Sequence, residues 1–407
     1  MNLHLRSQFI IHNSQLKLSG SKSETNRLLL LQALYPNIVL ENASDSDDSK
    51  VMTKALQSDE MVKDIHHAGT AMRFLTAFYT IQEGKEVILT GSSRMKERPI
   101  QILVDALRQL GAQIEYAEKE GFPPLRITGK KIVRNKVTLK ADVSSQYISA
   151  MLLIAPKLEN GLELTLEGAI TSVPYIKMTL ALLNEIGVKT SFEGNVIKVS
   201  HAEAIDKRKV TVESDWSSVS YFYSVVALSA IGTEIKLTSY KQNSLQGDSV
   251  LAEIYNELGI STTFENDSII VKKVNFQEKE LNRNLNASPD IAQTIAVTCL
   301  GLGIGCHLTG LHTLKIKETD RLEALKNELG KMGASVSVTN DSLTLTPTSE
   351  INKNIHIKTY QDHRMAMAFA PLALKVPIVI EEADVVSKSY PSFWEDFKSI
   401  GILVNPV

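Results

Sequence analysis

A polar octet, GSKSETNR, begins at Gly20 and combines two cations, Lys22 and Arg27, with three hydroxyl side chains. The leucine run from Leu28 to Leu31 that follows it is typical of the buried part of a helix. A polar loop that leads into a helix presents free backbone N–H groups and the positive end of the helix dipole, which favour bound anions. Taken alone, the octet is explained more simply as a helix cap with a solvated face.

Other segments of the chain share this character, because each sets cations, hydroxyl groups or an amide beside a glycine, in a charged loop or at an expected helix start. They are HHAGTAMRF (66–74), GSSRMKERP (91–99), SSQY (144–147), KIKETDR (315–321), QDHRMAMAFA (361–370) and SKSYP (387–391). Each segment alone fits a surface loop or a helix cap. Together with the octet, these segments supply eight cations: Lys22, Arg27, Arg73, Arg98, Lys317, Arg321, Arg364 and Lys388. Arginine is favoured where carboxylate or phosphate oxygens accept paired hydrogen bonds, so the set predicts an enzyme or receptor for small polyanions.

The same segments contain groups that can move protons. Asp290 (in NASPDIAQT), Glu318, His363 and Lys22 are the candidates, because carboxylates beside lysines in a cationic site can be tuned as general acid and base. Neither a P-loop nor a Gly-x-Gly-x-x-Gly pattern is present, which argues against a nucleotide-dependent ATPase or dehydrogenase. We expect no metal site, since no His, Cys or carboxylate cluster has metal-ligand spacing, and DSDDS (45–49) predicts a turn into a helix.

The bulk properties narrow the class of protein further. With 407 residues the chain has room for two or three domains, and 44 Lys and Arg against 46 Asp and Glu give a net charge of −2. This balance argues against a nucleic-acid or membrane-surface binder. We expect no signal peptide and no transmembrane helix. Cys299 and Cys306 lie in an apolar run and are expected to be core thiols in a reducing cytoplasm.

These residues must be positioned by a repeated structural element. Four segments read as an amphipathic helix, a glycine, a strand, a polar turn and a second strand, and a partial copy ends the chain. The pivotal glycines, about 70 residues apart, are Gly111, Gly187, Gly259, Gly333 and Gly401. Each stands where a helix C-terminus needs a left-handed residue, and the alternating strands indicate a half-buried sheet. A further copy is truncated, because the helix SKVMTKALQ runs on toward HHAGT without the strand pair.

Taken in order, the motifs resemble those of the 5-enolpyruvylshikimate-3-phosphate synthase family. The matching segments span essentially the whole chain: GSKSETNR, DSDD, AGTAMR, RMKERP, SSQY, SVPY, DWSS, NSLQGD, PDIAQT, KETDRL, DHRMAM and SKSYP. The resemblance implies transfer of the enolpyruvyl group of phosphoenolpyruvate to the 5-hydroxyl of shikimate 3-phosphate, with release of phosphate and without a metal or organic cofactor. It also implies the enolpyruvyl transferase fold, a two-lobed inside-out α/β barrel of repeated βαβαββ units, whose active site lies in the cleft between the lobes.

The resemblance assigns residues to both substrates and to the chemistry. For shikimate 3-phosphate it implies Lys22, Ser23, Arg27, Ser144, Ser145, Gln146, Ser172, Tyr175, Asp290 and Lys317. For phosphoenolpyruvate it implies Lys22, Gly69, Arg98, Gln146, Arg321, Arg364 and Lys388. It implies that Asp290 and Glu318 are the acid–base pair, with Lys22 as a further proton-transfer residue.

Three positions depart from the family pattern. His67 stands where Asn usually precedes AGTAMR, which puts one phosphoenolpyruvate contact in question. Phe74 stands where Pro commonly follows that motif, which puts the response to glyphosate in question. Thr313 replaces a frequent Asn, and one contact to the shikimate phosphate is expected to be weakened or replaced.

The resemblance also predicts how the chain is divided and what else it could be. One domain is expected to comprise residues 1–19 with 214–407, and the other residues 20–213. We expect a cytoplasmic monomer that binds neither nucleic acid nor membrane. The alternatives are a UDP-N-acetylglucosamine enolpyruvyl transferase, which usually has a loop cysteine in place of the RMKERP pattern, and a non-catalytic polyanion-binding relative. Neither Cys299 nor Cys306 is near that loop, and pure binding would not need Asp290 and Glu318 among so many cations.

Overall fold

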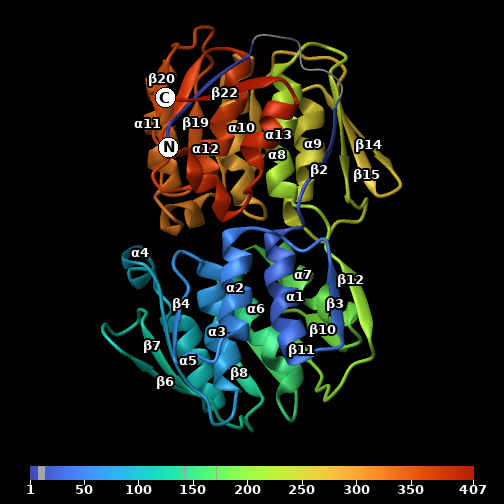
Figure 1. Cartoon of the computed structure of the whole chain (residues 1–407), viewed down its shortest axis with the longest axis vertical. Helices are drawn as coiled ribbons and strands as arrows, with labels where there is room; N and C mark the ends of the chain where they lie inside the picture. The colour runs from blue at the N-terminus through green and yellow to red at the C-terminus, as the bar shows by residue number, and fades with distance from the viewer. Residues whose placement is uncertain (8–13, 142–143, 171) are drawn as a thin grey trace. The chain divides into compact units, whose positions relative to one another are not determined.

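The chain folds into two compact units. The structure, a computed structural model of the whole chain, describes residues 1–7, 14–141, 144–170 and 172–407 (Figure 1). One unit, here the terminal unit, consists of Met1–Gly20 together with Glu213–Val407. The other, the middle unit, consists of Ser21–Val212. Each unit is therefore described by itself.

The terminal unit contains three four-stranded sheets among its described residues. In spatial order, the first is β2 (Ser14–Lys17), β13 (Glu234–Thr238), β15 (Ser268–Lys273) and β14 (Ile260–Glu265). The second is β16 (Leu281–Asn284), β17 (Cys306–Thr309), β19 (Leu343–Leu345) and β18 (Val336–Val338). The third is β20 (Ile355–Ile357), β21 (Ile378–Ile380), β1 (Leu3–Ser7) and β22 (Ile402–Pro406). The helices are α8 (Trp216–Leu228), α9 (Leu251–Glu257), α10 (Ala292–Leu302), α11 (Arg321–Lys331), α12 (His363–Phe369) and α13 (Phe393–Ser399).

The middle unit repeats this plan with one shorter sheet. Its four-stranded sheets are, in spatial order, β4 (Val62–Asp64), β5 (Glu86–Thr90), β7 (Leu125–Thr128) and β6 (Gln113–Tyr116), and β8 (Lys136–Lys140), β9 (Leu162–Glu167), β11 (Val196–Val199) and β10 (Thr190–Glu193). The third sheet contains β12 (Arg208–Thr211) and β3 (Ile38–Glu41). The helices are α1 (Lys22–Leu34), α2 (Asp47–Gln57), α3 (Gly69–Thr80), α4 (Ser93–Lys96), α5 (Gln101–Leu110), α6 (Ser145–Ile154) and α7 (Val173–Glu185).

Each four-stranded sheet has the pairing expected of a βαβαββ unit. In the second sheet of the terminal unit, for example, β16 and β17 are parallel, whereas β19 is antiparallel to both β17 and β18. Helices α8 and α10 are buried on nearly all faces, as befits helices enclosed by sheets rather than lying on the surface. In Figure 1 helices α1, α2 and α3 of the middle unit lie between β6 and β7 on one side and β3 and β12 on the other. The predicted fold class is confirmed.

The predicted glycine pivots are also confirmed. All five follow a helix and have positive φ, from 80° at Gly259 to 101° at Gly111. This left-handed backbone ends the helix and turns the chain into the next strand, and a side chain at such a position is strained. Gly259 carries a second constraint, because a Cβ atom there would lie 1.5 Å from the carbonyl oxygen of Asn275.

The predicted truncation lies in the sheet formed by β12 and β3. In the other repeats the second helix is followed by a pair of strands, or by β22 and the N-terminal β1. Here α2 ends at Gln57 and the short segment from Ser58 leads directly into β4. The missing hairpin leaves the two-stranded sheet of the middle unit.

Two further sequence expectations concern the core. Cys299 and Cys306 are both free and buried, as expected of core thiols. In the described residues, no helix combines the length and the apolar character needed to cross a membrane.

We predict that Gly259→Ala destabilises the terminal unit more than Gly111→Ala destabilises the middle unit. Both substitutions incur the cost of a left-handed alanine, about 1–2 kcal/mol. Only the first also forces a clash with Asn275, since none of the described residues lies within 4 Å of a Cβ at Gly111. Urea unfolding followed by tryptophan fluorescence and circular dichroism measures the difference. Equal losses in the two variants would contradict the close approach at Gly259.

Candidate active site

The octet of the sequence forms the start of α1. Ser21 caps the helix by accepting a hydrogen bond from the backbone N–H of Glu24, and Lys22 is the first helical residue. The Lys22 ammonium lies 3.3 Å from Oδ2 of Asp48, a buried carboxylate in the first turn of α2. The predicted turn at DSDDS is thus the start of α2, and it supplies a counter-charge for Lys22.

Arg27 is a buried cation held by neutral groups. Its Nε donates to the hydroxyl of Thr179 at 2.8 Å, Nη1 donates to the carbonyl of Ser23 at 2.8 Å, and Nη2 donates to the hydroxyl of Ser149 at 3.0 Å. The guanidinium also lies 5.4 Å from the ring centroid of Phe74. Burial lowers the pKa of Arg27 to about 10, so the residue stays protonated at neutral pH. A buried cation with such partners is well suited to receive an anion.

Three more helices of the middle unit begin at predicted site residues. Gly69 opens α3, Ser144 caps α6, and Ser172 precedes α7 with a positive φ of 52°, a backbone strain that often accompanies function. Ser145 is the buried first residue of α6. Four helix N-termini, counting that of α1, therefore carry predicted anion-binding residues.

Contacts link the starts of these helices. The side-chain amide of Gln146 donates to the hydroxyl of Thr70 at 3.1 Å, which joins α6 to α3. A Cβ on Gly69 would lie 2.5 Å from Nη1 of Arg98, so only glycine admits the guanidinium there. The backbone carbonyl of Tyr175 accepts from Nη2 of Arg27 at 3.5 Å.

In the terminal unit a second cluster forms around Arg321, the first residue of α11. Its guanidinium is 2% exposed and contacts three carboxylates. Nε lies 2.6 Å from Oδ2 of Asp362, Nη1 lies 2.9 Å from Oδ1 of Asp290, and Nη2 lies 2.9 Å from Oε2 of Glu318. Burial alone would lower the pKa of Arg321, but these carboxylates outweigh it and raise the pKa above its ordinary value. The guanidinium thereby fixes both predicted catalytic carboxylates.

Asp290 is surrounded by cations. Besides Arg321, the Nη2 atom of Arg364 lies 3.2 Å from its Oδ2, and the Lys317 ammonium lies 3.5 Å from its Oδ1. Burial would raise the pKa of Asp290, but Arg364, Lys317 and Arg321 outweigh burial and hold the pKa well below its usual range. Asp290 is therefore ionised at neutral pH and can act as a proton acceptor.

Glu318 bridges Arg321 and Lys388. Its Oε1 atom accepts a hydrogen bond from the Lys388 ammonium at 2.8 Å, while its Oε2 atom faces Arg321. The side chain of Glu318 is 15% exposed, so water screens these contacts little. Lys388, Arg321 and Glu318 thus form one hydrogen-bonded row.

A further carboxylate, Asp248, extends the network behind Arg364. Ser217 donates a hydrogen bond to Oδ2 of Asp248 and accepts one from Nη2 of Arg364 at 3.3 Å. Oδ1 of Asp248 is buried and accepts no hydrogen bond from the described part of the chain. Burial, followed by the charge of Asp290, raises the pKa of Asp248 to about 7.

The structure thus gathers the predicted residues into one set in each unit. The middle unit holds Lys22, Ser23, Arg27, Gly69, Arg98, Ser144, Ser145, Gln146, Ser172 and Tyr175, and the terminal unit holds Asp290, Lys317, Glu318, Arg321, Arg364 and Lys388. Sequence reasoning gave no role to Asp48, Asp248 and Asp362, although each lies in a quoted motif. Their partners are distant in sequence, and no spacing rule connects them. Among the described residues no group of three or more His, Cys, Asp or Glu side chains could hold a metal ion.

Comparison with known proteins identifies the family. The sequence profile of EPSP synthase (3-phosphoshikimate 1-carboxyvinyltransferase) matches residues 54–397. A 3-phosphoshikimate 1-carboxyvinyltransferase of Bacteroides fragilis (strain YCH46) is 47% identical over 390 residues, which are 95% of each chain. The chain belongs to the EPSP synthase family. A relative of the same name from Haemophilus influenzae (strain ATCC 51907) is 37% identical over 421 aligned positions, covering 95% of this chain and 96% of the relative.

Solved structures agree on the fold of this EPSP synthase family member. An EPSP synthase from Acinetobacter baumannii superimposes with a TM-score of 0.81 at 20% identity, covering 100% of both chains. The enolpyruvyl transferase NikO from Streptomyces tendae gives a TM-score of 0.75 at 13% identity, covering 100% of this chain and 99% of that one. At such identities these two structures support the fold alone.

The three departures from the EPSP synthase pattern have distinct surroundings. The ring nitrogen Nδ1 of His67 lies 2.9 Å from the hydroxyl of Ser92, and His67 is exposed. Phe74 is fully buried beneath Arg27. The hydroxyl of Thr313, which stands in place of the frequent Asn, is buried and makes no hydrogen bond to any residue that the structure describes.

We predict that Asp362→Asn destabilises the terminal unit by about 3–5 kcal/mol, since it removes a buried carboxylate from a buried guanidinium. Asparagine still caps α12, as Asp362 does by accepting from the N–H of Arg364, so the loss reports the charge rather than the cap. Asp320→Asn is the matched control, because Asp320 caps α11 but is partly exposed. Its expected effect is within about 0.5 kcal/mol. Equal effects in urea unfolding would refute the role of the Arg321 pair.

Asp248 predicts a specific pH dependence of stability. Its pKa is raised from about 4 in the unfolded chain, so between pH 4 and 7 the folded protein keeps a proton that the unfolded chain releases. This contribution is full below pH 4 and is lost as the pH rises through 7. Asp248→Asn should therefore gain stability relative to wild type over this range, by up to about 4 kcal/mol.

The measurement is urea unfolding of both proteins from pH 4 to 8. Asp267→Asn, at an exposed aspartate in the same unit, serves as the control and should run parallel to wild type. A constant difference between Asp248→Asn and wild type across this range would show that Asp248 does not titrate there.

Proposed function

We propose that this protein transfers the enolpyruvyl group of phosphoenolpyruvate to the 5-hydroxyl of shikimate 3-phosphate and releases phosphate, a step in aromatic amino-acid biosynthesis. The observation that carries the proposal is the cluster in which Asp290 and Glu318 are held among Arg321, Arg364, Lys317 and Lys388. Such a cluster combines proton-transfer groups with the charge needed for a substrate that carries a carboxylate and a phosphate. Family membership supports the same reaction.

For shikimate 3-phosphate, we assign the phosphate mainly to the middle unit. Arg27, Ser23, Ser144, Ser145, Ser172 and Tyr175 combine a buried cation with hydroxyl groups near helix starts, which suits a dianionic phosphate. Lys22 and Gln146 face both substrates in this assignment. Asp290 and Lys317 receive the shikimate ring hydroxyls and complete the site.

For phosphoenolpyruvate, we assign Arg321, Arg364 and Lys388 from the terminal unit, together with Lys22, Gly69, Arg98 and Gln146. The Nε atom of Arg98 is buried and has no hydrogen-bond partner among the described residues, which supports a guanidinium available to an anion. Arg321, Arg364 and Lys388 are paired with carboxylates in this structure. Binding of phosphoenolpyruvate must therefore share these cations between the substrate and the carboxylates.

The proposed proton transfers depend on how the cations are shared between phosphoenolpyruvate and the carboxylates. Asp290 is ionised and accepts the proton of the 5-hydroxyl, whose oxygen attacks C2 of phosphoenolpyruvate. Glu318 delivers a proton to C3, which turns the methylene into a methyl group and gives a tetrahedral intermediate. When Arg321 and Lys388 turn to the substrate's anionic groups they neutralise Glu318 less, which favours its protonated form. Loss of phosphate and return of a C3 proton complete the transfer, and Lys22 is a further candidate for these proton steps.

Phosphate release tests the proposal against its alternatives. The protein is incubated with phosphoenolpyruvate and shikimate 3-phosphate, and in parallel with phosphoenolpyruvate and UDP-N-acetylglucosamine. Phosphate release with the first pair alone is expected. Release with the UDP sugar would favour the other enolpyruvyl transferase activity, whereas binding of both substrates without release would favour the non-catalytic relative.

The proposal includes a cytoplasmic monomer that acts on small molecules and engages neither nucleic acid nor membrane. The near-neutral net charge of −2 supports the lack of a nucleic-acid partner. Sedimentation at micromolar concentration tests the monomer.

We predict that Asp290→Asn and Glu318→Gln each slow the chemical step by roughly 10²- to 10⁴-fold. The carboxamides keep the shape of the side chains but remove the titratable oxygen. Single-turnover rates at saturating substrates measure the step, and Glu323→Gln, an exposed change on α11, is the control with an unchanged rate. If Glu318 merely orients Arg321, Glu318→Gln will raise KM and leave kcat within a few-fold, which would overturn its assignment.

A further inference from the structure

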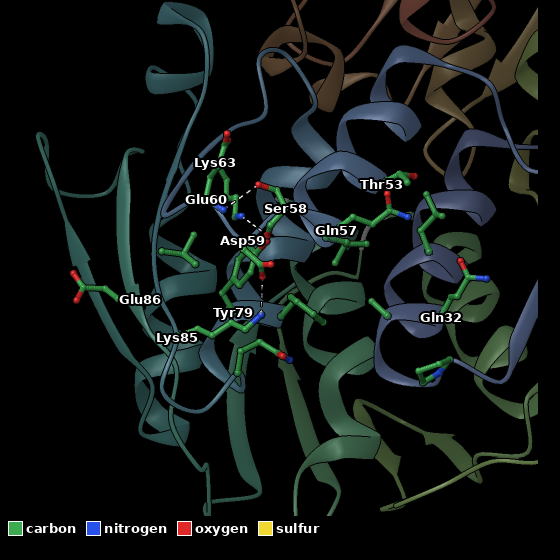
Figure 2. A pocket seen from close by; sticks show the side chains of 17 residues that line it. Gln32, Thr53, Gln57, Ser58, Asp59, Glu60, Lys63, Tyr79, Lys85 and Glu86 are labelled. Carbon is green, nitrogen blue, oxygen red and sulfur yellow. Dashed lines mark hydrogen bonds and ion pairs between the residues drawn. The ribbon is translucent and has the colours of Figure 1, made fainter.

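A pocket of about 650 Å³ lies on the middle unit, apart from all the residues assigned above (Figure 2). Its apolar lining includes Leu29 and Ala33 of α1, Leu56 of α2, Phe78 of α3 and Val87 of β5. The segment that takes the place of the missing hairpin, from Ser58 to Glu60, lines it as well. The volume is typical of pockets for small organic molecules.

Lys63 of β4 gives this pocket a charge. In β4 the apolar side chain faces solvent and the charged one faces the interior: Val62 is 50% exposed, whereas Lys63 is only 4% exposed. The other five strands that begin a repeat bury apolar residues at such positions: Leu16 in β2, Val137 and Leu139 in β8, Val210 in β12, Leu281 in β16 and Ile357 in β20. Strand β4 thus buries a charged side chain where the equivalent strands bury apolar ones, and such exceptions often occur at functional sites.

The Lys63 ammonium has hydrogen-bonding capacity to spare. It donates to the carbonyl of Ser58 at 2.6 Å, and no other acceptor in the described part of the chain meets its three donors. Within the described residues no carboxylate lies within 4.0 Å of it: Asp59 instead pairs with Lys85 at 3.9 Å, and Glu60 is exposed. Burial lowers the pKa of Lys63, and the nearby charges of Glu60 and Asp59 partly offset this effect. A buried cation that has no carboxylate within ion-pair distance among the described residues favours an anionic ligand.

We propose that this pocket binds a small carboxylate with an apolar body, whose carboxylate pairs with the Lys63 ammonium. The apolar side chains of α1, α2 and α3 would cover the body of the ligand. Gln32, Thr53 and Gln57, on the other side of the pocket in Figure 2, offer hydrogen bonds to a polar substituent. The proposal rests on this pocket alone and not on the enolpyruvyl transfer.

Binding of 3-phenylpropionate to the intact protein, measured by calorimetry and by saturation-transfer NMR, tests the proposal. We expect a dissociation constant of about 1 mM or below for a ligand of this size. The neutral analogue 3-phenylpropionamide should bind about tenfold more weakly or worse, because it cannot pair with Lys63. Saturating phosphoenolpyruvate should leave the affinity unchanged. Displacement by phosphoenolpyruvate would instead place the probe among the cations assigned to that substrate.

Two variants locate the site. Lys63→Met keeps the length of the side chain and should weaken 3-phenylpropionate binding about tenfold or more while leaving the amide unaffected. Lys85→Met is the matched control at the pocket's exposed lysine, with an expected change of less than about twofold. Ala33→Trp, at an exposed position, should block the pocket even if Lys63→Met folds poorly. Equal binding of acid and amide, no binding of the acid, or unchanged binding in Ala33→Trp or in a folded Lys63→Met would overturn the proposal.

Discussion

In the terminal unit, the positions of both carboxylates proposed for proton transfer depend on one buried guanidinium, that of Arg321. Removing Arg321 from water costs several kcal/mol, and this cost is acceptable only where oppositely charged groups surround it. Asp290, Glu318 and Asp362 come from three separate segments of the chain, so the need to neutralise Arg321 brings these segments together. The same contacts hold the two carboxylates proposed for proton transfer at fixed positions before any substrate arrives. The same ion pairs therefore stabilise the terminal unit and hold the proposed catalytic carboxylates in place. In the proposed reaction, the anionic groups of a substrate must compete with these carboxylates for Arg321.

The middle unit treats its buried arginine differently. Arg27 donates its hydrogen bonds to hydroxyl groups and backbone carbonyls, which orient the guanidinium. Burial lowers the pKa of Arg27 more than the charges of Tyr175 and Glu24 raise it, so its charge is compensated less fully than that of Arg321, and the proposed assignment gives this charge to a phosphate. This contrast fits the proposed assignment of a phosphate to the middle unit and of the proton-transfer steps to the terminal unit. Phe74, one of the three departures from the family pattern, packs beneath Arg27 and therefore borders this cation.

Much of the fold could be predicted from the sequence, because each repeat is recognisable from residues that are close together in the chain. A helix, a glycine with positive φ and two alternating strands follow from short-range rules, and even the truncation after SKVMTKALQ is visible as a missing segment. The cations of the candidate site could be predicted because they lie in recognisable sequence motifs. What the sequence does not reveal is which carboxylate meets which cation: Asp362 lies 41 positions from Arg321, and Asp290 lies 74 positions from Arg364. Lys63 was missed for another reason, since the burial of β4 is set by its neighbours in the sheet and not by its own pattern.

Helices α1 and α2 connect the proposed substrate residues with the pocket around Lys63. Helix α1 carries Lys22 and Arg27 in its first half and lines the pocket with Leu29 and Ala33 farther along, while α2 carries Asp48 at its start and Leu56 in the pocket. The ion pair between Lys22 and Asp48 and the hydrogen bond from Ser49 to Asn26 join the starts of the two helices. A ligand in the pocket would contact the far ends of the same two helices, so the pocket and the proposed substrate residues share helices without sharing residues. This separation is the reason why phosphoenolpyruvate is expected to leave binding in the pocket unchanged.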